Sequence, residues 1–324
     1  MSAKIIKFVN PRTGRTLQKC KDSLYDQLSN EYFPIVNEIP RFCESVNYTD
    51  SFGFQWKIFD RTQLDTFSKL DISESRFYAE TEWKPQDFLG LNVLEVGSGA
   101  GRFSEVVLRT TEAHLYSIDY SRAVEVNLKN NLKYLDRLHL AQASIYHMPF
   151  PDDCFDRVFC LGVLQHTPSF EDSVKALVRK TRIGGEIVVD FYPINGWYTK
   201  VHAKYILRPI TKRLPKKVLL YLIRKNSPWM LRFFDILTHF KLGVFTRFLP
   251  ITDVRGFPQA LSAAERLEWA IMDSFDGFSP AFDNPQRVEN VARMFSQCGC
   301  RVTFSGYVSY GSGSAAVVRA VKKG

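Results

Sequence analysis

Several features that would define a class of protein are missing from this sequence of 324 residues. Its six cysteines are scattered and form no C-x-x-C pair, so neither a zinc site nor a disulfide framework is indicated. No long apolar run follows the N-terminal lysines, which argues against a secretory signal. The longest apolar runs, such as Val218–Ile223, are far too short to span a bilayer. We therefore expect a cytoplasmic protein that holds no metal.

Acidic residues are nearly absent from the segment Tyr198–Leu249, which holds twelve lysines and arginines against one acid, Asp235. The net charge of this segment, about +11, exceeds the +9 of the whole chain, so the segment carries the entire basic excess. Such a stretch suits an anionic partner, which could be a phosphate group, a membrane surface or a nucleic acid. A membrane partner would place the protein at the inner face of the membrane. The alternative is a solvated basic face without a partner.

From Asn92 onward, short apolar stretches alternate with stretches of helical periodicity. Nearly continuous apolar strands, each followed by a helix, indicate a parallel sheet that is covered on both faces. Two more apolar stretches near the C-terminus predict a closing pair of strands. The strands expected are Asn92–Val96, His114–Asp119, Leu138–Ser144, Phe155–Gly162, Glu186–Tyr192, Arg301–Val308 and Ala315–Val321.

The sequence pattern divides the chain into five segments. Residues 1–60 are predicted to form a small unit, and residues 61–91 a helical linker. Residues 92–197 form the α/β core, which the helical and basic residues 198–284 interrupt. Residues 285–324 then return to the core with a helix and the closing strands.

A glycine-rich turn, Gly97-Ser98-Gly99-Ala100-Gly101, lies directly between the first core strand and a helix, and Glu95 precedes it. Glycine is needed where a backbone turns sharply and a ligand must approach it closely. Asp119 ends the next strand, where a carboxylate can accept hydrogen bonds from both hydroxyls of a ribose. Together these features predict a nucleoside-containing ligand rather than a tight turn that binds nothing.

Two classes of ligand fit this turn, namely dinucleotides and S-adenosylmethionine. The dinucleotide fingerprint is G-x-G-x-x-G with a pyrophosphate at the helix N-terminus, whereas this chain has G-x-G-x-G. Glu95 would repel a pyrophosphate but would attract the positively charged amino group and sulfonium of S-adenosylmethionine. We therefore predict S-adenosylmethionine as the cofactor.

Residues 92–192 resemble class I S-adenosylmethionine-dependent methyltransferases of the Methyltransferase-11 or ubiquinone-methyltransferase-like type. The resemblance rests on VLEVGSGAGRF, YSIDYS, ASIYHMPFPDDCFDRVFCLGVLQHTP and RKTRIGGEIVVDFY, and it covers about a third of the chain. It implies a Rossmann-like α/β fold with a mostly parallel seven-stranded sheet and helices on both faces. The small N-terminal unit and the helical insert would be additions to that fold.

The resemblance also implies roles for individual residues. The glycine-rich turn and the acid before it would border the methionine part of the cofactor, and Asp119 would hold the ribose. Tyr120 would lie against the adenine, Ser144 and Ile145 at the adenine edge, and Leu161 near the sulfur. Ser144 stands where the family commonly has Asp, and a hydroxyl binds the adenine amine less strongly than a carboxylate does. The cofactor-binding residues implied are Glu95, Gly97, Ser98, Gly99, Gly101, Asp119, Tyr120, Ser144, Ile145 and Leu161.

The start of the chain contains NPRTGRTL and later YFPIVNEIPRF, which resemble the small Trm112-like zinc-ribbon unit ahead of many bacterial methyltransferases. Asn10 and Thr13 stand where that unit has its C-P-x-C pair. We therefore predict the shape of the ribbon without its metal.

Methyl transfer to an oxygen usually requires the removal of a proton, so a general base is useful. His166, in QHTP after the fourth core strand, would lie at the carboxyl end of the sheet, where ligands bind in open α/β folds. We predict His166 as this base. The alternative is a loop histidine that only orients the structure.

The resemblance favours O-methylation of a small molecule, a sugar or a lipid-linked glycan, with the basic insert covering the acceptor. An RNA methyltransferase that uses this insert is a second hypothesis. The chain has no RNP or KH signature and no N/D-P-P-Y/F loop, so nucleic acid is not the expected partner. A non-catalytic binding protein on the same fold is a third hypothesis, which would be expected to lose the glycines or Asp119. The oligomeric state stays open.

Overall fold

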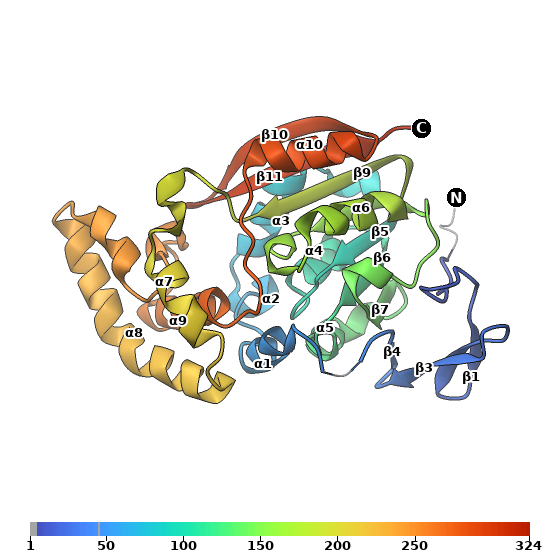
Figure 1. The fold of residues 1–324 in the computed structure, drawn as a ribbon, viewed down its shortest axis with the longest axis horizontal. Helices are drawn as coiled ribbons and strands as arrows, with labels where there is room; N and C mark the ends of the chain where they lie inside the picture. Colours follow the sequence, from blue (N-terminus) through green and yellow to red (C-terminus); the bar gives the residue numbers. More distant parts are fainter. Residues whose placement is uncertain (1–4, 45) are drawn as a thin grey trace.

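A seven-stranded sheet forms the centre of the computed structural model, which describes residues 5–44 and 46–324 (Figure 1). Its strands lie in the order β10-β11-β9-β8-β5-β6-β7. The strands from β5 to β9 run parallel, whereas β11 is antiparallel to β9 and β10 is antiparallel to β11. The predicted mostly parallel sheet is thereby confirmed. The bounds are β5 Asn92–Val96, β6 His114–Asp119, β7 Leu138–Gln142, β8 Phe155–Cys160, β9 Thr181–Phe191, β10 Cys300–Tyr310 and β11 Gly313–Lys322.

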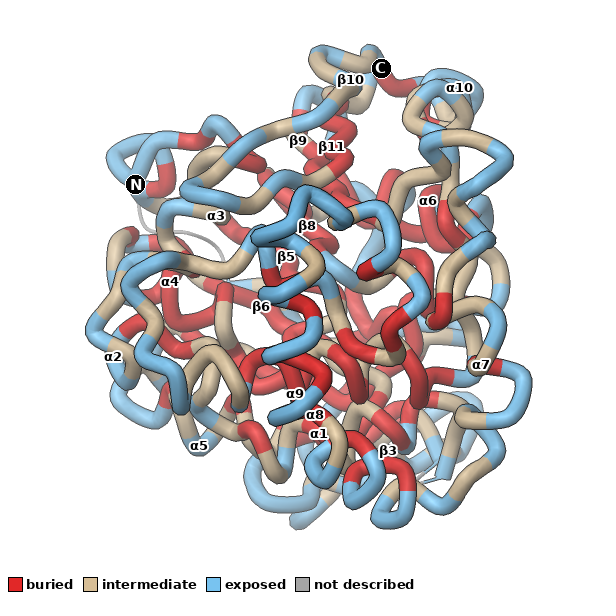
Figure 2. Tube along the Cα trace, turned by 90° about the vertical axis from the view of Figure 1, so that its left-hand side faces the viewer, coloured by how far each residue is buried: buried red, intermediate tan, exposed pale blue. Residues whose placement is uncertain are grey.

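Two hydrophobic cores lie on opposite faces of the central sheet. Alternate strand residues such as Leu94 pack with α6 and α10, while their neighbours such as Val93 pack with α3, α4 and α5. Figure 2 shows the buried segments running through these strands. Burial on both faces explains why the strands are nearly continuous apolar runs. The helix bounds are α3 Ile72–Thr81, α4 Arg102–Thr110, α5 Val124–Asn130, α6 Phe170–Lys180 and α10 Val288–Gln297.

A separate antiparallel sheet precedes the core and packs against its edge strand β7. The backbone N–H of Phe42 donates to the carbonyl of Gln142 at 2.8 Å, and the Arg41 guanidinium donates to the Gln142 side chain at 2.8 Å. The ring of Phe8 adds apolar contact with the rings of Phe42 and Phe150. The strands of this small sheet, in spatial order, are β1 Gln18–Cys20, β2 Ser23–Asp26, β3 Glu31–Val36 and β4 Ile39–Pro40.

Polar side chains connect two turns of the N-terminal unit. Asn10 Nδ2 donates to Asp26 Oδ2 at 2.8 Å and to Ser29 Oγ at 3.2 Å, and Thr13 Oγ1 donates to Asp26 Oδ2 at 2.9 Å. Desolvation raises the pKa of Asp26, but hydrogen bonds from Ser29, Thr13 and Asn10 outweigh it and hold this pKa well below its usual range. Asn10 and Thr13, which stand where the resembled zinc-ribbon unit has its cysteine pair, therefore bond to a carboxylate of their own chain.

A group of helices is inserted between β9 and α10 and extends from one end of the molecule (Figure 1). Its longest helix, α8, packs on α9 through two small apolar cores, which include Ile223 with Phe275 and Phe234 with Ala270. None of the helices among the described residues has the length and apolar character that a bilayer-spanning segment needs. The inserted helices are α7 Ala203–Thr211, α8 Lys216–His239 and α9 Ala263–Phe278. Two further helices, α1 Asp50–Ile58 and α2 Asp65–Ser68, precede β5 in the chain.

We predict that the purified full-length protein contains no stoichiometric zinc. The amide, hydroxyl and carboxylate groups of Asn10, Thr13 and Asp26 bond to one another, and neither turn contains a cysteine that could supply a thiolate. Elemental analysis of protein purified without chelators measures this. The prediction is wrong if about one zinc per chain survives dialysis and is lost in the variant Asp26→Ala.

Candidate functional site

A cavity of about 1300 Å³ lies where the parallel strands end. Its wall includes Val96, Asp119, Leu161 and Phe191, which stand at or directly after the carboxyl ends of β5, β6, β8 and β9. Residues of α1, α3 and α9 complete the wall. Ligands of open α/β sheets bind at this end, so the cavity is the candidate site.

The glycine-rich turn after β5 forms part of the cavity wall, and the packing around it explains two of its glycines. Gly97 has a φ of +85°, and a Cβ there would lie 2.4 Å from Cγ2 of Val163. Gly99 has a φ of +53°, and its Cβ would lie 2.9 Å from Nε1 of Trp56. Any other residue would be strained in backbone conformation and would collide with these side chains. The turn thus exposes backbone rather than side chains to the cavity.

Asp119 lies beside this turn and is already engaged with backbone donors. Its Oδ2 accepts the N–H of Gly99 at 2.8 Å, and its Oδ1 accepts both the N–H and the hydroxyl of Ser121 at 2.7 Å. Burial raises the pKa of Asp119, and the hydrogen bonds from Ser121 and Gly99 oppose that shift. The carboxylate is therefore fixed in orientation at the end of β6.

Most of the predicted cofactor residues line the cavity together. The ring of Tyr120 lies 5.2 Å from the ring of Tyr48, centroid to centroid, so an aromatic wall flanks the end of β6. The predicted residues in the cavity wall are Gly97, Ser98, Gly99, Asp119, Tyr120, Ile145, Leu161 and His166.

Glu95 lies outside the cavity wall, beneath the turn. Its carboxylate accepts hydrogen bonds from the hydroxyls of Ser104 and Ser117, and burial raises its pKa to about 7. In a strand, alternate residues share a face, so Glu95 points to the same side as Val93, toward α4. The side chain of Glu95 thus braces α4 and β6 beneath the turn, and its place beside the ligand stays a prediction.

Two further predicted residues serve local structure rather than the cavity wall. A Cβ on Gly101 would lie 2.3 Å from Oδ1 of Asn127, so this glycine allows α4 and α5 to pack closely. The Ser144 hydroxyl accepts the N–H of Tyr146 at 3.3 Å and caps a short 3₁₀ helix. The contact of the Ser144 hydroxyl with an adenine amine stays a prediction, while the neighbouring Ile145 lines the cavity.

His166 is a buried residue of the cavity wall with one free nitrogen. Its Nδ1 lies 3.1 Å from the carbonyl of Phe282, and a carbonyl can only accept, so Nδ1 carries the proton. Its Nε2 has no hydrogen-bond partner among the described residues and lies 3.8 Å from Oδ2 of Asp276. Burial lowers the pKa of His166, and the charge of Asp276 opposes this. The imidazole is thus neutral, and its Nε2 is a buried lone-pair nitrogen beside Asp276.

The carboxylate of Asp276 is held by two further groups. The Tyr192 hydroxyl donates to its Oδ2 at 3.0 Å, and Gln55 Nε2 donates to its Oδ1 at 3.4 Å. One turn earlier on α9, Asp273 also lines the cavity, and burial raises its pKa to about 7. The position of both acids beside His166 depends on how the distant helix α9 packs.

Arg76, from α3, is a cavity residue that the sequence analysis did not identify. Its guanidinium forms ion pairs with Glu80, at 2.7 Å, and with Asp190. Asp190 also accepts the backbone N–H of Gly162, so the network joins α3 to the ends of β8 and β9. No local pattern marks Arg76, because only the packing of α3 brings it to the cavity.

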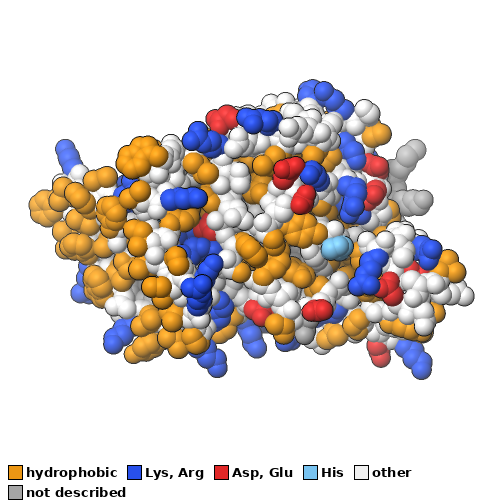
Figure 3. Space-filling model, in the orientation of Figure 1, with side chains coloured by type: hydrophobic (Ala, Val, Ile, Leu, Met, Phe, Trp, Pro, Cys, Tyr) orange, Lys and Arg blue, Asp and Glu red, His pale blue; other side chains and the backbone are white. Residues whose placement is uncertain are grey.

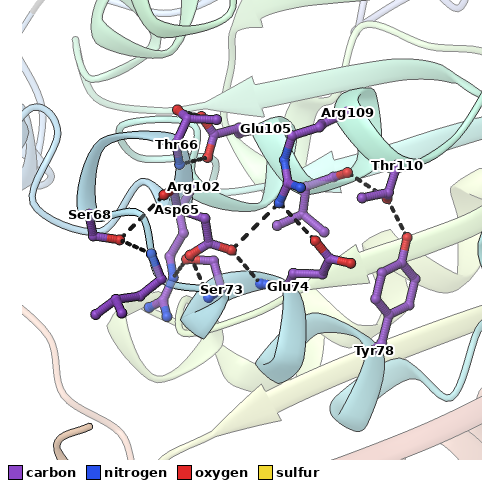
Figure 4. Close-up of polar contacts among 12 residues, drawn as sticks. Asp65, Thr66, Ser68, Ser73, Glu74, Tyr78, Arg102, Glu105, Arg109 and Thr110 are labelled. Atoms are coloured by element: carbon purple, nitrogen blue, oxygen red, sulfur yellow. Dashed lines mark hydrogen bonds and ion pairs between the residues drawn. The ribbon is translucent and has the colours of Figure 1, made fainter. Parts of the chain in front are cut away.

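Arg102 is the other cation that the sequence analysis missed, although it directly follows the glycine-rich turn. It lines the cavity, and its Nε donates to Ser73 Oγ at 2.8 Å (Figure 4). The Asp65 carboxylate accepts the N–H groups of Ser73 and Glu74 at 2.8 Å each, and Arg109 pairs with Glu74 at 2.9 Å. This network fixes α2, α3 and α4 to one another. Arg102 itself forms no ion pair with any residue that the structure describes.

The basic segment Tyr198–Leu249 contributes less to the cavity than the sequence led us to expect. Only His202 and Lys204 of this segment line it. The cover is formed instead by residues 251–260 and by α9, which follow the segment in the chain. The long helix α8 lies behind α9, away from the cavity wall.

Comparison with known proteins identifies the domain around this cavity. Residues 94–189 match the family model described as a methyltransferase domain. Methyltransferase GfsG of Streptomyces halstedii is 24% identical over 187 residues, which cover 54% of this chain and 62% of that protein. Sterol 24-C-methyltransferase ERG6B of Gibberella zeae is 32% identical over 101 residues, which cover 30% of this chain and 26% of that protein. A tRNA U34 carboxymethyltransferase of Nautilia profundicola is 30% identical over 141 residues, which cover 43% of this chain and 44% of that protein.

The chain therefore spans less than two thirds of the length of each of these relatives. Among solved structures, it is similar to a chain in the complex between the Haloferax volcanii Trm112 methyltransferase activator and a methyltransferase. The TM-score is 0.50 at 12% identity, with 86% of this chain and 100% of that chain covered, and this likeness concerns the fold. Residues 94–189 thus match a methyltransferase domain, and the fold around them is shared with a solved chain of a methyltransferase complex.

Proposed function

We propose that the protein transfers the methyl group of S-adenosylmethionine to a hydroxyl oxygen of a small molecule, a sugar or a lipid-linked glycan. The observation that carries this proposal is the neutral, buried His166 in the cavity wall, whose Nε2 has no hydrogen-bond partner among the described residues and lies 3.8 Å from Oδ2 of Asp276. A hydroxyl acceptor needs a proton acceptor of this kind, whereas a more acidic or already charged nucleophile does not.

The cofactor would occupy the part of the cavity between the glycine-rich turn and β6. Asp119 would accept hydrogen bonds from the ribose hydroxyls, and the aromatic and apolar wall of Tyr120 and Ile145 would hold the adenine. Arg76 already has two carboxylate partners. Arg102 has none among the described residues, so it is the cation available for the carboxylate of the methionine part.

When bound, S-adenosylmethionine supplies a methyl group that is already activated for in-line displacement. The acceptor oxygen forms a bond to the methyl carbon as the sulfur–carbon bond breaks, which leaves a methyl ether and S-adenosylhomocysteine. The hydroxyl proton moves to Nε2 of His166, and the resulting imidazolium is stabilised by the carboxylate of Asp276. The hydrogen bonds from Tyr192 and Gln55 keep that carboxylate facing the ring.

An RNA acceptor is the second candidate, because the insert is basic and one relative is named a tRNA carboxymethyltransferase. RNA binding needs cations that line the path of the RNA phosphate backbone into the site. Of the basic segment Tyr198–Leu249, only His202 and Lys204 line the cavity, and Lys204 is paired with Asp283. A small hydroxyl acceptor is therefore favoured.

We predict that the protein binds S-adenosylmethionine and S-adenosylhomocysteine but not NAD. The substitution Asp119→Ala should weaken cofactor binding by about 1–3 kcal/mol, the scale of hydrogen bonds to a charged group. Isothermal titration calorimetry measures the affinity for each of these ligands and the effect of the substitution. The exposed acid Asp136, changed to Ala, serves as the matched control and should leave the affinity unchanged. An unchanged dissociation constant in a folded Asp119→Ala variant would remove this residue from the site.

We predict that Arg102→Gln raises the dissociation constant of S-adenosylmethionine about tenfold, as loss of a charge-assisted hydrogen bond implies. Decarboxylated S-adenosylmethionine lacks the group that Arg102 would bind, so the same substitution should leave its affinity nearly unchanged. Calorimetry with the two compounds separates a direct contact from a general disturbance of the turn. An equal loss for both compounds would show that Arg102 only supports the structure.

We predict that His166→Gln lowers kcat about 10²- to 10⁴-fold, the usual contribution of a general base, with little change in cofactor affinity. Burial lowers the pKa of His166, so Nε2 becomes protonated only at a pH below the usual histidine range. The wild-type rate should therefore fall only when the pH drops below that range. This acid limb should vanish in the variant. A screen of hydroxyl acceptors with labelled cofactor provides the assay, and the exposed His147→Gln is the control. Retention of the acid limb in His166→Gln would assign the base to another group.

A further inference from the structure

The helix α8 carries a second apolar stripe on the side turned away from α9. Its first stripe, which includes Leu219, Ile223 and Phe234, is buried against the insert. Residues of the second stripe recur every three, four or seven positions, the spacing of one helix face, and are 41–68% exposed. They are Val218, Leu222, Trp229, Phe233, Ile236 and Phe240.

More exposed apolar side chains follow directly after α8. The 3₁₀ segment Gly243–Phe248 packs against α8 and presents Val244, Phe245 and Phe248, which are 50–65% exposed. In Figure 3 hydrophobic side chains gather along the edge of the molecule where Figure 1 draws α8. Contiguous exposed apolar surface of this kind marks a binding surface. We call this stripe and the segment after it the α8 outer face.

Cations are interleaved with the apolar residues of the α8 outer face. Lys225 lies three residues after Leu222 and four before Trp229, and Arg232 lies about two turns after Lys225 on the same side of the helix. The neighbouring exposed cations are Lys217, Arg224 and Lys241. The single acid of α8, Asp235, is bonded to Arg266 of α9 at 2.6 and 2.8 Å. The face therefore offers positive charge and no free carboxylate.

We propose that the α8 outer face docks the protein on an anionic lipid bilayer, with the helix lying in the plane of the interface. Aromatic and aliphatic residues interleaved with lysine and arginine are the composition of interfacial helices. Anionic headgroups would complement the cations, while the apolar stripe would enter the boundary of the acyl chains. A second copy of this chain fits less well, because it would bring two cationic faces together.

This inference is independent of the proposed methyl transfer, since it concerns residues that do not line the cavity. It nevertheless concerns the place at which the protein would bind its methyl acceptor. Trp269, Asp273 and Asp276 of α9 line the cavity, and other residues of α9 pack on α8. Docking would therefore hold the cavity one helix layer from the bilayer surface.

Vesicle co-sedimentation of the full-length protein, without cofactor or acceptor, tests the proposal. Vesicles of phosphatidylcholine with about a third phosphatidylglycerol should bind the protein, and pure phosphatidylcholine should bind it much more weakly. Trp229→Ser/Phe233→Ser/Ile236→Ser should lower the partition coefficient at least about tenfold. The control removes three exposed apolar residues elsewhere, by Leu28→Ser/Leu89→Ser/Leu132→Ser, and should bind as the wild type does. Circular dichroism and thermal melting establish that both triple variants are folded.

A charge variant completes the experiment. Lys217→Gln/Arg224→Gln/Lys225→Gln/Arg232→Gln should lose binding to the anionic vesicles and the dependence of that binding on salt. Neutralising four exposed lysines elsewhere should have little effect. Equal binding by the apolar variant and its control, or no wild-type binding to anionic vesicles, would overturn the proposal. So would a wild-type dimer in solution that the apolar variant converts to a monomer. The four control positions are Lys19, Lys69, Lys84 and Lys133.

Discussion

The hydrogen bond from the Gly99 N–H to the Asp119 carboxylate joins the turn after β5 to the end of the neighbouring strand β6. It fixes the backbone of the turn against Trp56 of α1, where a Cβ on Gly99 would have no space. The wall of the cavity, the start of α4 and the position of Arg102 all follow from this turn. Because Glu95 supports the turn from below through Ser104, the same few residues determine both the strand end and the helix that follows it.

Much of the core could be predicted from the sequence because its strands are buried on both faces. Such strands are short, apolar and bounded by turns, and five of them with intervening helices leave few alternatives to a parallel sheet. The carboxyl ends of neighbouring strands then place the glycine-rich turn, Asp119 and His166 at one edge. The position of Glu95 outside the cavity wall also had a signal in the sequence. The alternation of side chains along a strand puts Glu95 on the face of Val93, which the helices cover.

Residues contributed by other helices could not be predicted in the same way. Arg76, Asp273 and Asp276 reach the cavity because α3 and α9 pack over the strand ends, and no spacing along the chain encodes that approach. Charge composition located the basic segment but not the residues that cover the cavity. The cover of the cavity is formed by residues 251–260 and α9, and the cations of α8 lie on the opposite side of that helix pair. Net charge describes a segment, whereas a binding face depends on which side of each helix is buried.

The length of α8 is difficult to explain by the cavity alone. The helix α9 already supplies the side chains of the cavity wall, and the buried stripe of α8 is sufficient to support α9. A helix with only that task would carry polar residues on its solvent side, since exposed apolar surface costs solubility. Trp229, Phe233 and Phe240 are instead exposed together with cations. The second stripe is therefore the surface that the proposed docking on an anionic bilayer would cover, and its cations would complement the headgroups.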